Sequence, residues 1–269
     1  MMCFKKNNSA FSLVELAVVI AIIGAIIAGG LMTAVGKREI ERVRKTNALM
    51  REIMKAIDDY ADYHGHLPCP ADPALRFGDN GFGLQSTANT EAQQESDTVT
   101  TCDTTPAGIF AAAGNVIIGG LPVYTLNLPP EYAIDAWNKR FTYAVDQDLT
   151  YYGRIYVDPT AGRGYGDRGD ESDGIPAQIS GNIIVHNASG ADLTAGGEGA
   201  AVIIVSHGPN GLGAWGGRGV STVGIAAGLE AENTNNDNVF IQSVLSATFD
   251  DIVVYAPKWQ LNGTELKKQ

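Results

Sequence analysis

Near its amino terminus the chain reads FSLVELAVVIAIIGAIIAGGLMTAV over residues 11–35. From residue 16 to residue 35 no side chain is charged, and Thr33 is the only polar one. A helix of about 20 residues spans roughly 30 Å, the thickness of the hydrocarbon core of a bilayer. We therefore predict that residues 16–35 cross a membrane, after a short amino-terminal segment, residues 1–10, that carries two lysines.

Two features of this run limit its interpretation. A cleaved secretory signal peptide and a plain signal anchor are two alternatives, but the apolar region of a signal peptide is about 7–15 residues long, which is shorter than this run. The second feature is Glu15, which places a carboxylate beside the apolar residues. Because a charge deep in a bilayer costs about 2.5–3.5 kcal/mol even on insertion scales, Glu15 either stays hydrated at the interface or has a partner or a function.

The string FSLVELAVVIAIIGAI, which starts at Phe11, resembles the amino terminus of type IV prepilins and type II secretion pseudopilins. The resemblance implies that a prepilin peptidase cleaves between Ala10 and Phe11 and that the new amino terminus is methylated. It also implies that Glu15, the fifth mature residue, pairs with the Phe11 ammonium group of a neighbouring subunit during assembly. The chain departs from the family in having alanine where glycine usually precedes the cleavage site, and in having no proline between Phe11 and Leu67.

The helical pattern continues beyond the apolar run. Apolar residues recur at helical spacing from Ile40 to Ala61, and Gly65 followed by Pro68 ends the pattern. We therefore expect residues 11–64 to form one helix of roughly 80 Å. Residues 65–269 would form a globular head that covers the apolar stripe of this helix.

Short apolar runs bounded by glycine and proline predict strands in the head, so the expected fold class is α+β. The predicted strands are residues 140–146, 152–157, 182–186, 201–206 and 251–255. The resemblance implies the pilin fold, in which a long amino-terminal helix packs on an antiparallel sheet. The segments LPCPADPA, DAWNKRFTYAV and FDDIVVY also look like the head of a large minor-pilin-like group.

Cleavage of the leader would remove Cys3 and leave Cys69 and Cys102 in a head that is expected to be exported. Oxidising compartments favour disulfide bonds, so we predict a bridge between these two cysteines. Metal binding by two isolated cysteines is the weaker alternative.

Two polar loops are candidate calcium sites. SHGPNGLGAWGG (206–217), followed by LEAENTNNDNVFI (229–241), resembles the calcium loop of the major type II secretion pseudopilin. Glu232, Asn235 and Asp237, together with backbone carbonyl groups near Asn210, would supply oxygen ligands, and a solvated asparagine-rich loop is the alternative. The second loop contains Asp167, Asp170, Glu171 and Asp173, and an exposed acidic loop is its simpler interpretation.

The sequence contains no catalytic signature that we can assign. Nucleophile elbows, zinc-binding HExxH motifs and phosphate-binding loops are absent from it. Ser206 and His207 are adjacent, so their side chains would point to opposite faces of a strand. The formal net charge of -11 argues against a nucleic-acid-binding protein, because such proteins present a basic face. We therefore expect neither an enzyme nor a nucleic-acid partner.

The expected function is that of a structural subunit of a type IV pilus or a type II secretion pseudopilus. The subunit would wait in the bacterial inner membrane as a single-pass protein with its head in the periplasm. Its expected partners are prepilin peptidase, other pilin or pseudopilin subunits, the inner-membrane assembly machinery and membrane lipid. The alternative is a membrane-anchored periplasmic binding module that uses a pilin-type anchor, and an anchored hydrolase is a third class.

Overall fold

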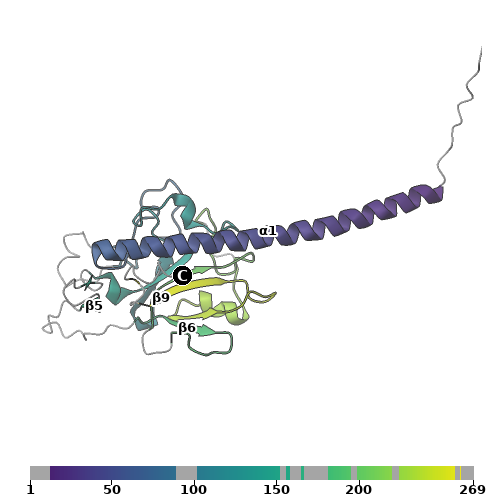
Figure 1. Cartoon of the computed structure of the whole chain (residues 1–269). Helices are drawn as coiled ribbons and strands as arrows, with labels where there is room; N and C mark the ends of the chain where they lie inside the picture. Colours follow the sequence, from purple (N-terminus) through teal and green to yellow (C-terminus); the bar gives the residue numbers. More distant parts are fainter. Residues whose placement is uncertain are drawn as a thin grey trace, which may run out of the picture. The chain divides into compact units, whose positions relative to one another are not determined.

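A computed structural model describes residues 13–88, 102–151, 156–157, 165–166, 181–194, 199–219, 224–257 and 261, without the side chains of residues 25–36, 156–157 and 165–166. These residues form one long helix, a five-stranded sheet and two two-stranded sheets, which confirms the expected α+β class (Figure 1). The chain divides into two compact units, Met1–Arg44 and Lys45–Gln269. The leader, residues 1–10, lies outside the described residues, and so does the acidic loop from Asp167 to Asp173.

Helix α1 runs from Leu13 to His64 and contains 52 residues. It ends where Gly65 adopts a φ of 72° and donates its N–H to the carbonyl oxygen of Ala61 at 2.8 Å. Glycine enters this left-handed conformation without a Cβ clash, which is why it ends helices so often. Among the described residues, no helix is both long and apolar enough for a membrane span. The predicted span, residues 16–35, lies partly outside the described residues, since side chains from residue 25 onward are not included.

The five-stranded sheet is antiparallel throughout and has the strand order β1-β2-β3-β7-β9. Its strands are β1 (Phe110–Ala112), β2 (Val116–Gly120), β3 (Thr142–Asp146), β7 (Ala200–Ser206) and β9 (Ile252–Pro257). In its register Ile118 lies opposite Ala144, and Ala144 lies opposite Ile203. These pairs carry apolar side chains across the middle of the sheet, which gives the sheet an apolar face.

The two smaller sheets differ from the sequence expectation in extent and direction. Strand β4 (Tyr156–Val157) pairs with β5 (Tyr165–Gly166), so the described strand covers only the end of the predicted segment 152–157. Strand β6 (Ile184–Asn187) pairs with β8 (Val239–Gln242) in parallel, whereas the resemblance implied antiparallel pairing. The parallel pairing is possible because more than 50 residues separate these strands along the chain, ample for a crossover connection.

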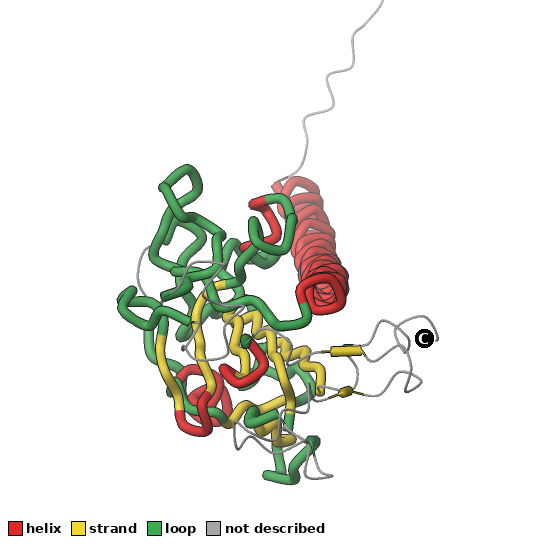
Figure 2. Tube along the Cα trace, turned by 90° about the vertical axis from the view of Figure 1, so that its left-hand side faces the viewer, coloured by secondary structure: helices red, strands yellow, loops and turns green. Residues whose placement is uncertain are grey.

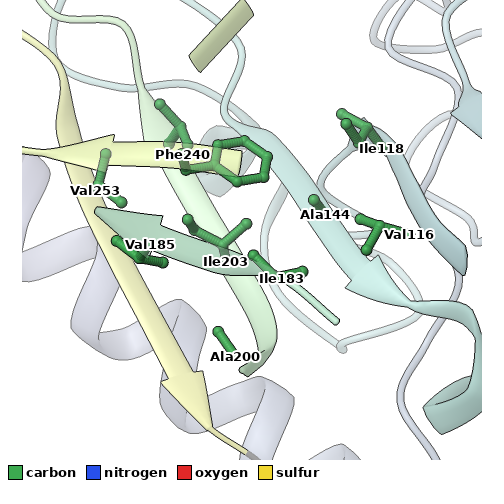
Figure 3. Packing of buried hydrophobic residues seen from close by; sticks show 10 residues of the cluster. Val116, Ile118, Ala144, Ile183, Val185, Ala200, Ile203, Phe240 and Val253 are labelled. Atoms are coloured by element: carbon green, nitrogen blue, oxygen red, sulfur yellow. The ribbon is translucent and has the colours of Figure 1, made fainter. Parts of the chain in front are cut away.

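One face of the five-stranded sheet packs against the β6–β8 pair. Figure 3 shows side chains from β2, β3, β7 and β9 meeting side chains from the segments of β6 and β8. The buried members of this cluster are Val116, Ile118, Ala144, Ile183, Val185, Ala200, Ile203, Val205, Phe240 and Val253. Since each is at most 5% exposed, the cluster forms a buried core layer. Fully burying one large aliphatic side chain contributes about 1.5–3 kcal/mol.

The opposite face of the same sheet packs against the part of α1 that follows Lys45 (Figures 1 and 2). Side chains alternate between faces along a strand, so Tyr143 and Val145 point away from the cluster of Figure 3, and both are fully buried. Met50, Ile53 and Ile57 of the helix are also completely buried. Hydrogen bonds add to this packing, because the Ala136 N–H donates to Thr46 Oγ1, and Tyr132 donates to Glu52.

A disulfide joins Cys69 to Cys102, with their Cα atoms 5.4 Å apart. Cys69 lies five residues beyond the end of α1, and its N–H donates to Gln85 Oε1 at 3.0 Å. The Gln85 N–H in turn donates to Thr125 Oγ1 at 2.8 Å. The bridge therefore closes a segment that contains no helix or strand among its described residues and that is held to the head through a few hydrogen bonds.

A buried carboxylate lies at the end of β3. Asp146 is fully buried, and its Oδ2 accepts hydrogen bonds from the N–H and the Nδ2 of Asn182 at 2.9 Å and 3.0 Å, while Oδ1 accepts from the Asp148 N–H. Burial raises the pKa of Asp146 to about 7, and the charge of Asp148 adds to this effect, although the hydrogen bonds from Asp148 and Asn182 oppose it. Asp146 thus ties the end of β3 to the segment that leads into β6.

The disulfide gives a prediction for stability. Replacing Cys69 and Cys102 by serine together should lower the free energy of unfolding by about 3–4 kcal/mol, because the unfolded chain regains the entropy of an open loop. Urea unfolding of the full chain in detergent would measure this change. Reductant should destabilise the wild type by a similar amount and leave the double variant unchanged; a wild type that is insensitive to reductant would contradict the prediction.

The raised pKa of Asp146 predicts a pH dependence of stability. Between about pH 4 and pH 7 the folded protein keeps a proton on Asp146 that the unfolded chain has released, so the contribution of this group falls as pH rises. Asp146→Asn should therefore flatten the decline of the free energy of unfolding from pH 4 to pH 7. Urea unfolding at three pH values in that range measures both slopes, and equal slopes for variant and wild type would contradict the prediction.

Candidate functional site

The first described turns of α1 carry an apolar surface that surrounds the helix. Every described side chain from Leu13 to Ile23 is exposed in the single chain. The large apolar ones are Leu13, Val14, Leu16, Val18, Val19, Ile20, Ile22 and Ile23, with exposed fractions from 46% to 85%. Consecutive positions point about 100° apart on a helix, so these residues cover all sides of it. A helix that is apolar all round normally lies in a membrane or inside a large assembly.

Glu15 lies in the first turn of α1, within this apolar surface. A carboxylate at this end of a helix is stabilised by the helix dipole, because the unpaired N–H groups there carry partial positive charge. Ala10 and Phe11, the residues of the expected cleavage site, lie outside the described residues. The described part of this amino-terminal segment is therefore the apolar surface from Leu13 to Ile23, with Glu15 within it.

Charged residues follow the apolar stretch on the same helix. Arg42 and Arg44 each pair with a glutamate three residues earlier, Glu39 and Glu41, at 3.6 Å and 3.2 Å. Exposed pairs of this kind contribute little to stability, about 0.2–1 kcal/mol. These pairs matter for where they lie, because they give this part of α1 a charged surface that is compatible with water.

The three residues predicted to bind calcium lie together at the end of η5 (Gly228–Thr234). Asn235 Nδ2 donates to Glu232 Oε2 at 2.7 Å and to Asp237 Oδ2 at 2.8 Å. The amide group of Asn235 thus already occupies one oxygen of each carboxylate. Asn210, which the sequence placed near this trio, donates from its Nδ2 to Glu230 Oε2 at 3.0 Å. The Asn210 side chain therefore contacts Glu230, a residue that the expected calcium site did not include.

A second acidic cluster, which the sequence did not reveal, consists of Glu230, Asp250 and Asp251. One carboxylate oxygen from each lies within 4.8 Å of the others. Glu230 comes from η5, and the two aspartates immediately precede β9. Glu230 and Asp251 are 4% and 2% exposed. The only sequence signal for this cluster was the Asp-Asp pair in FDDIVVY, which also fits an ordinary strand start.

His207 lies next to this cluster and is completely buried. Its Nε2 shares a hydrogen bond of 2.8 Å with Thr142 Oγ1, and its Nδ1 lies 3.7 Å from Asp251 Oδ1. Burial lowers the pKa of His207 to about 4, so the ring is neutral at physiological pH. Burial also raises the pKa of Asp251 to about 7; the charges of Glu230 and Asp250 add to the effect, and the hydrogen bond from Asn233 opposes it. His207 therefore does not neutralise the acidic cluster.

Ser206 and His207 have separate partners on opposite faces of the sheet. Ser206 Oγ donates to Asp135 Oδ2 at 2.7 Å, whereas the His207 ring bonds Thr142. Asp135 Oδ1 also accepts the backbone N–H groups of Trp137 and Lys139, and burial raises the pKa of Asp135. Ser206 therefore donates to a carboxylate that holds a turn, and no hydrogen bond activates it through His207.

The comparisons with known proteins concern the amino-terminal segment. Residues 5–31 match a family model described as the prokaryotic N-terminal methylation motif. The match spans Ala10, Phe11 and Glu15, and it leaves the head uncovered. No curated protein and no solved structure matches the chain. The chain therefore carries, over residues 5–31, the signature of type IV prepilins and pseudopilins, which indicates a pilin- or pseudopilin-like processed subunit.

Proposed function

We propose that the chain is a structural subunit of a type IV pilus or a type II secretion pseudopilus. The observation that carries this proposal is the coincidence of the methylation motif, residues 5–31, with a helix that is apolar on all sides from Leu13 to Ile23. A helix with such a surface needs a cover around its whole circumference. Membrane lipid supplies one such cover, and identical helices packed in a filament supply another.

Before assembly the subunit spans the inner membrane once, through residues 16–35, with its leader in the cytoplasm and its head in the periplasm. Prepilin peptidase cleaves between Ala10 and Phe11, and the new amino group is methylated. The Cys69–Cys102 disulfide suits an exported head, because disulfides persist in oxidising compartments. The inner-membrane assembly machinery then transfers the processed subunit from lipid to the filament.

Within the filament, the Glu15 carboxylate pairs with the Phe11 ammonium group of a neighbouring subunit. Each charge is costly by itself in an apolar environment, and the two become complementary when they meet. The pairing also sets the axial position of one helix against the next, since apolar side chains alone would allow several registers. Glu15 thus serves assembly rather than insertion.

We further propose that the protein is not an enzyme and that its head acts by contact with other macromolecules. Ser206 and His207, the nearest approach to a nucleophile and base, each bond a different residue. The fold of the head supports a pilin-like arrangement, because the apolar stripe of α1 from Met50 to Ala61 is buried against an antiparallel sheet. A membrane-anchored binding module remains the second candidate, since the motif match ends at residue 31.

The proposal predicts the behaviour of Glu15→Ala. The variant should insert in the membrane and be cleaved as the wild type is, yet enter filaments at least tenfold less. Truncating one partner of a buried charge pair costs about 2–5 kcal/mol, and about 1.4 kcal/mol already corresponds to tenfold. The measurement is the ratio of the protein in sheared filaments to the protein in the membrane fraction, read by immunoblot.

Glu41→Ala is the matched control, because it removes the same charge from an exposed position farther along α1. It should enter filaments normally. Wild-type incorporation of Glu15→Ala would overturn the assigned role of Glu15. If the wild-type protein stays out of filaments and forms no cross-links with other pilins, the binding module replaces the filament subunit as the better function.

A further inference from the structure

We propose that His64 and His66 bind a divalent transition-metal ion, zinc or copper, at the carboxyl end of α1. The two histidines flank Gly65, the residue at which the helix ends. This inference does not depend on the proposed function of the chain, because it concerns only the head. It also uses none of the residues of the calcium sites that the sequence suggested.

The separation of the two imidazole rings suits one shared ion. Their centroids lie 5.9 Å apart, with an angle of 60° between the ring planes. Zinc lies about 2.0–2.1 Å from an imidazole nitrogen, so two imidazoles on one ion have centroids about 5–6.5 Å apart at tetrahedral or wider angles. Imidazole is a ligand that zinc and copper both prefer.

Tyr60 packs against both rings. Its ring stacks on that of His64 with the centroids 4.0 Å apart, and it meets the ring of His66 edge-on at 5.6 Å. Both histidines therefore lie on the same side of the helix end as Tyr60. The tyrosine is itself buried, and Gln85 Nε2 donates to its hydroxyl group at 3.5 Å. Because this neighbour restricts the rotamers of both histidines, less order must be gained when a metal ion binds.

The hydrogen bond of His66 selects the tautomer that a metal ion needs. His66 Nδ1 lies 3.0 Å from the carbonyl oxygen of Leu67, and since a carbonyl group only accepts, Nδ1 carries the proton. The lone pair is then on Nε2, which forms no hydrogen bond within the described part of the chain. Histidines that bind metals commonly donate their other N–H to a carbonyl group in this way.

Burial also keeps the His66 ring in the form that binds a metal ion. It lowers the pKa of His66, and the neighbouring His64 adds to this effect, although the hydrogen bond to Leu67 opposes it. A metal ion binds the neutral imidazole, so no proton has to be displaced from His66 at neutral pH.

The end of the helix is a favourable environment for a cation. The last carbonyl groups of a helix carry partial negative charge, and His64 lies in the last turn of α1. Asp58, Asp59 and Asp62 lie in the last two turns as well, and of these Asp59 pairs with Lys55. His64 is exposed, so water can occupy the coordination positions that the two imidazoles leave open.

The experiment uses the full chain in detergent, with Cys3→Ser in every sample because a free thiol would compete for the metal. After treatment with a chelator, the protein is titrated with zinc chloride by calorimetry. About 5 mM magnesium chloride is present throughout, because magnesium occupies sites that consist of carboxylate oxygens alone. We expect one zinc ion per chain. When copper(II) replaces zinc, pulsed electron paramagnetic resonance should detect two imidazole ligands.

His64→Gln should weaken zinc binding at least tenfold and leave copper with at most one imidazole ligand. Since His64 is exposed, this variant should keep its fold, which circular dichroism checks. His66→Gln should show the same loss, and His64→Gln alone decides the question if His66→Gln does not fold.

His186→Gln is the matched control, because His186 lies in β6 and its ring contacts no other histidine in the described part of the chain. It should bind zinc as the wild type does. The proposal is overturned if the wild type binds no zinc in the presence of magnesium, or if His64→Gln binds zinc as tightly as the wild type. It is also overturned if the wild-type copper spectrum shows a single imidazole, or if His186→Gln loses as much affinity as His64→Gln.

Discussion

Burial of the apolar stripe of α1 against the five-stranded sheet is the interaction on which the head depends. Met50, Ile53, Ile57 and Ala61 lose all contact with water, and the sheet face that covers them contributes Tyr143 and Val145. The other sheet face would then be exposed, and the β6–β8 pair covers it with Val185 and Phe240. A helix, a sheet and a small parallel pair thus form three layers, because each apolar face needs a partner.

The same helix poses a different physical problem nearer its amino terminus. Between Leu13 and Ile23 the apolar side chains point in every direction, so a single sheet face could never cover them. A surface of this kind is normal in lipid or in a bundle of like helices. The change from an all-round apolar surface to a one-sided stripe occurs within one continuous helix, and Glu39, Glu41 and their arginine partners lie between the two parts.

Buried carboxylates show two ways in which the head accommodates charge. Asp135 and Asp146 each accept three hydrogen bonds, so they act as fixed points that hold a turn and a strand end. Among the described residues, Asp251 accepts a single hydrogen bond at its carboxylate, from Asn233, and it lies beside two further carboxylates. Asp251 Oδ1 therefore differs from the oxygens of Asp135 and Asp146, because it is buried and has no hydrogen-bond partner in the described part of the chain.

The amino-acid sequence by itself determined the features that depend on local pattern. Helical periodicity and Gly65 set the end of α1, and the string from Phe11 carried the family signature. Runs of β-branched residues marked β3, β7 and β9, because such runs favour extended backbone wherever they occur. Neither β1 nor β2 was predicted from the sequence. The two alanines of β1 (FAA) disfavour a strand, whereas the Val-Ile-Ile run of β2 (VIIGG) favours one and was missed.

Only the tertiary structure decided which distant residues meet. Strands β6 and β8 lie far apart in the sequence, and no local signal shows that they pair or that they run parallel. Asn210, Glu230 and Asp250 are spaced 20 residues apart along the chain, so their convergence follows from the packing of the loops on the sheet. Sequence motifs are recognised from spacing along the chain, so contacts between residues that lie this far apart leave no local signal.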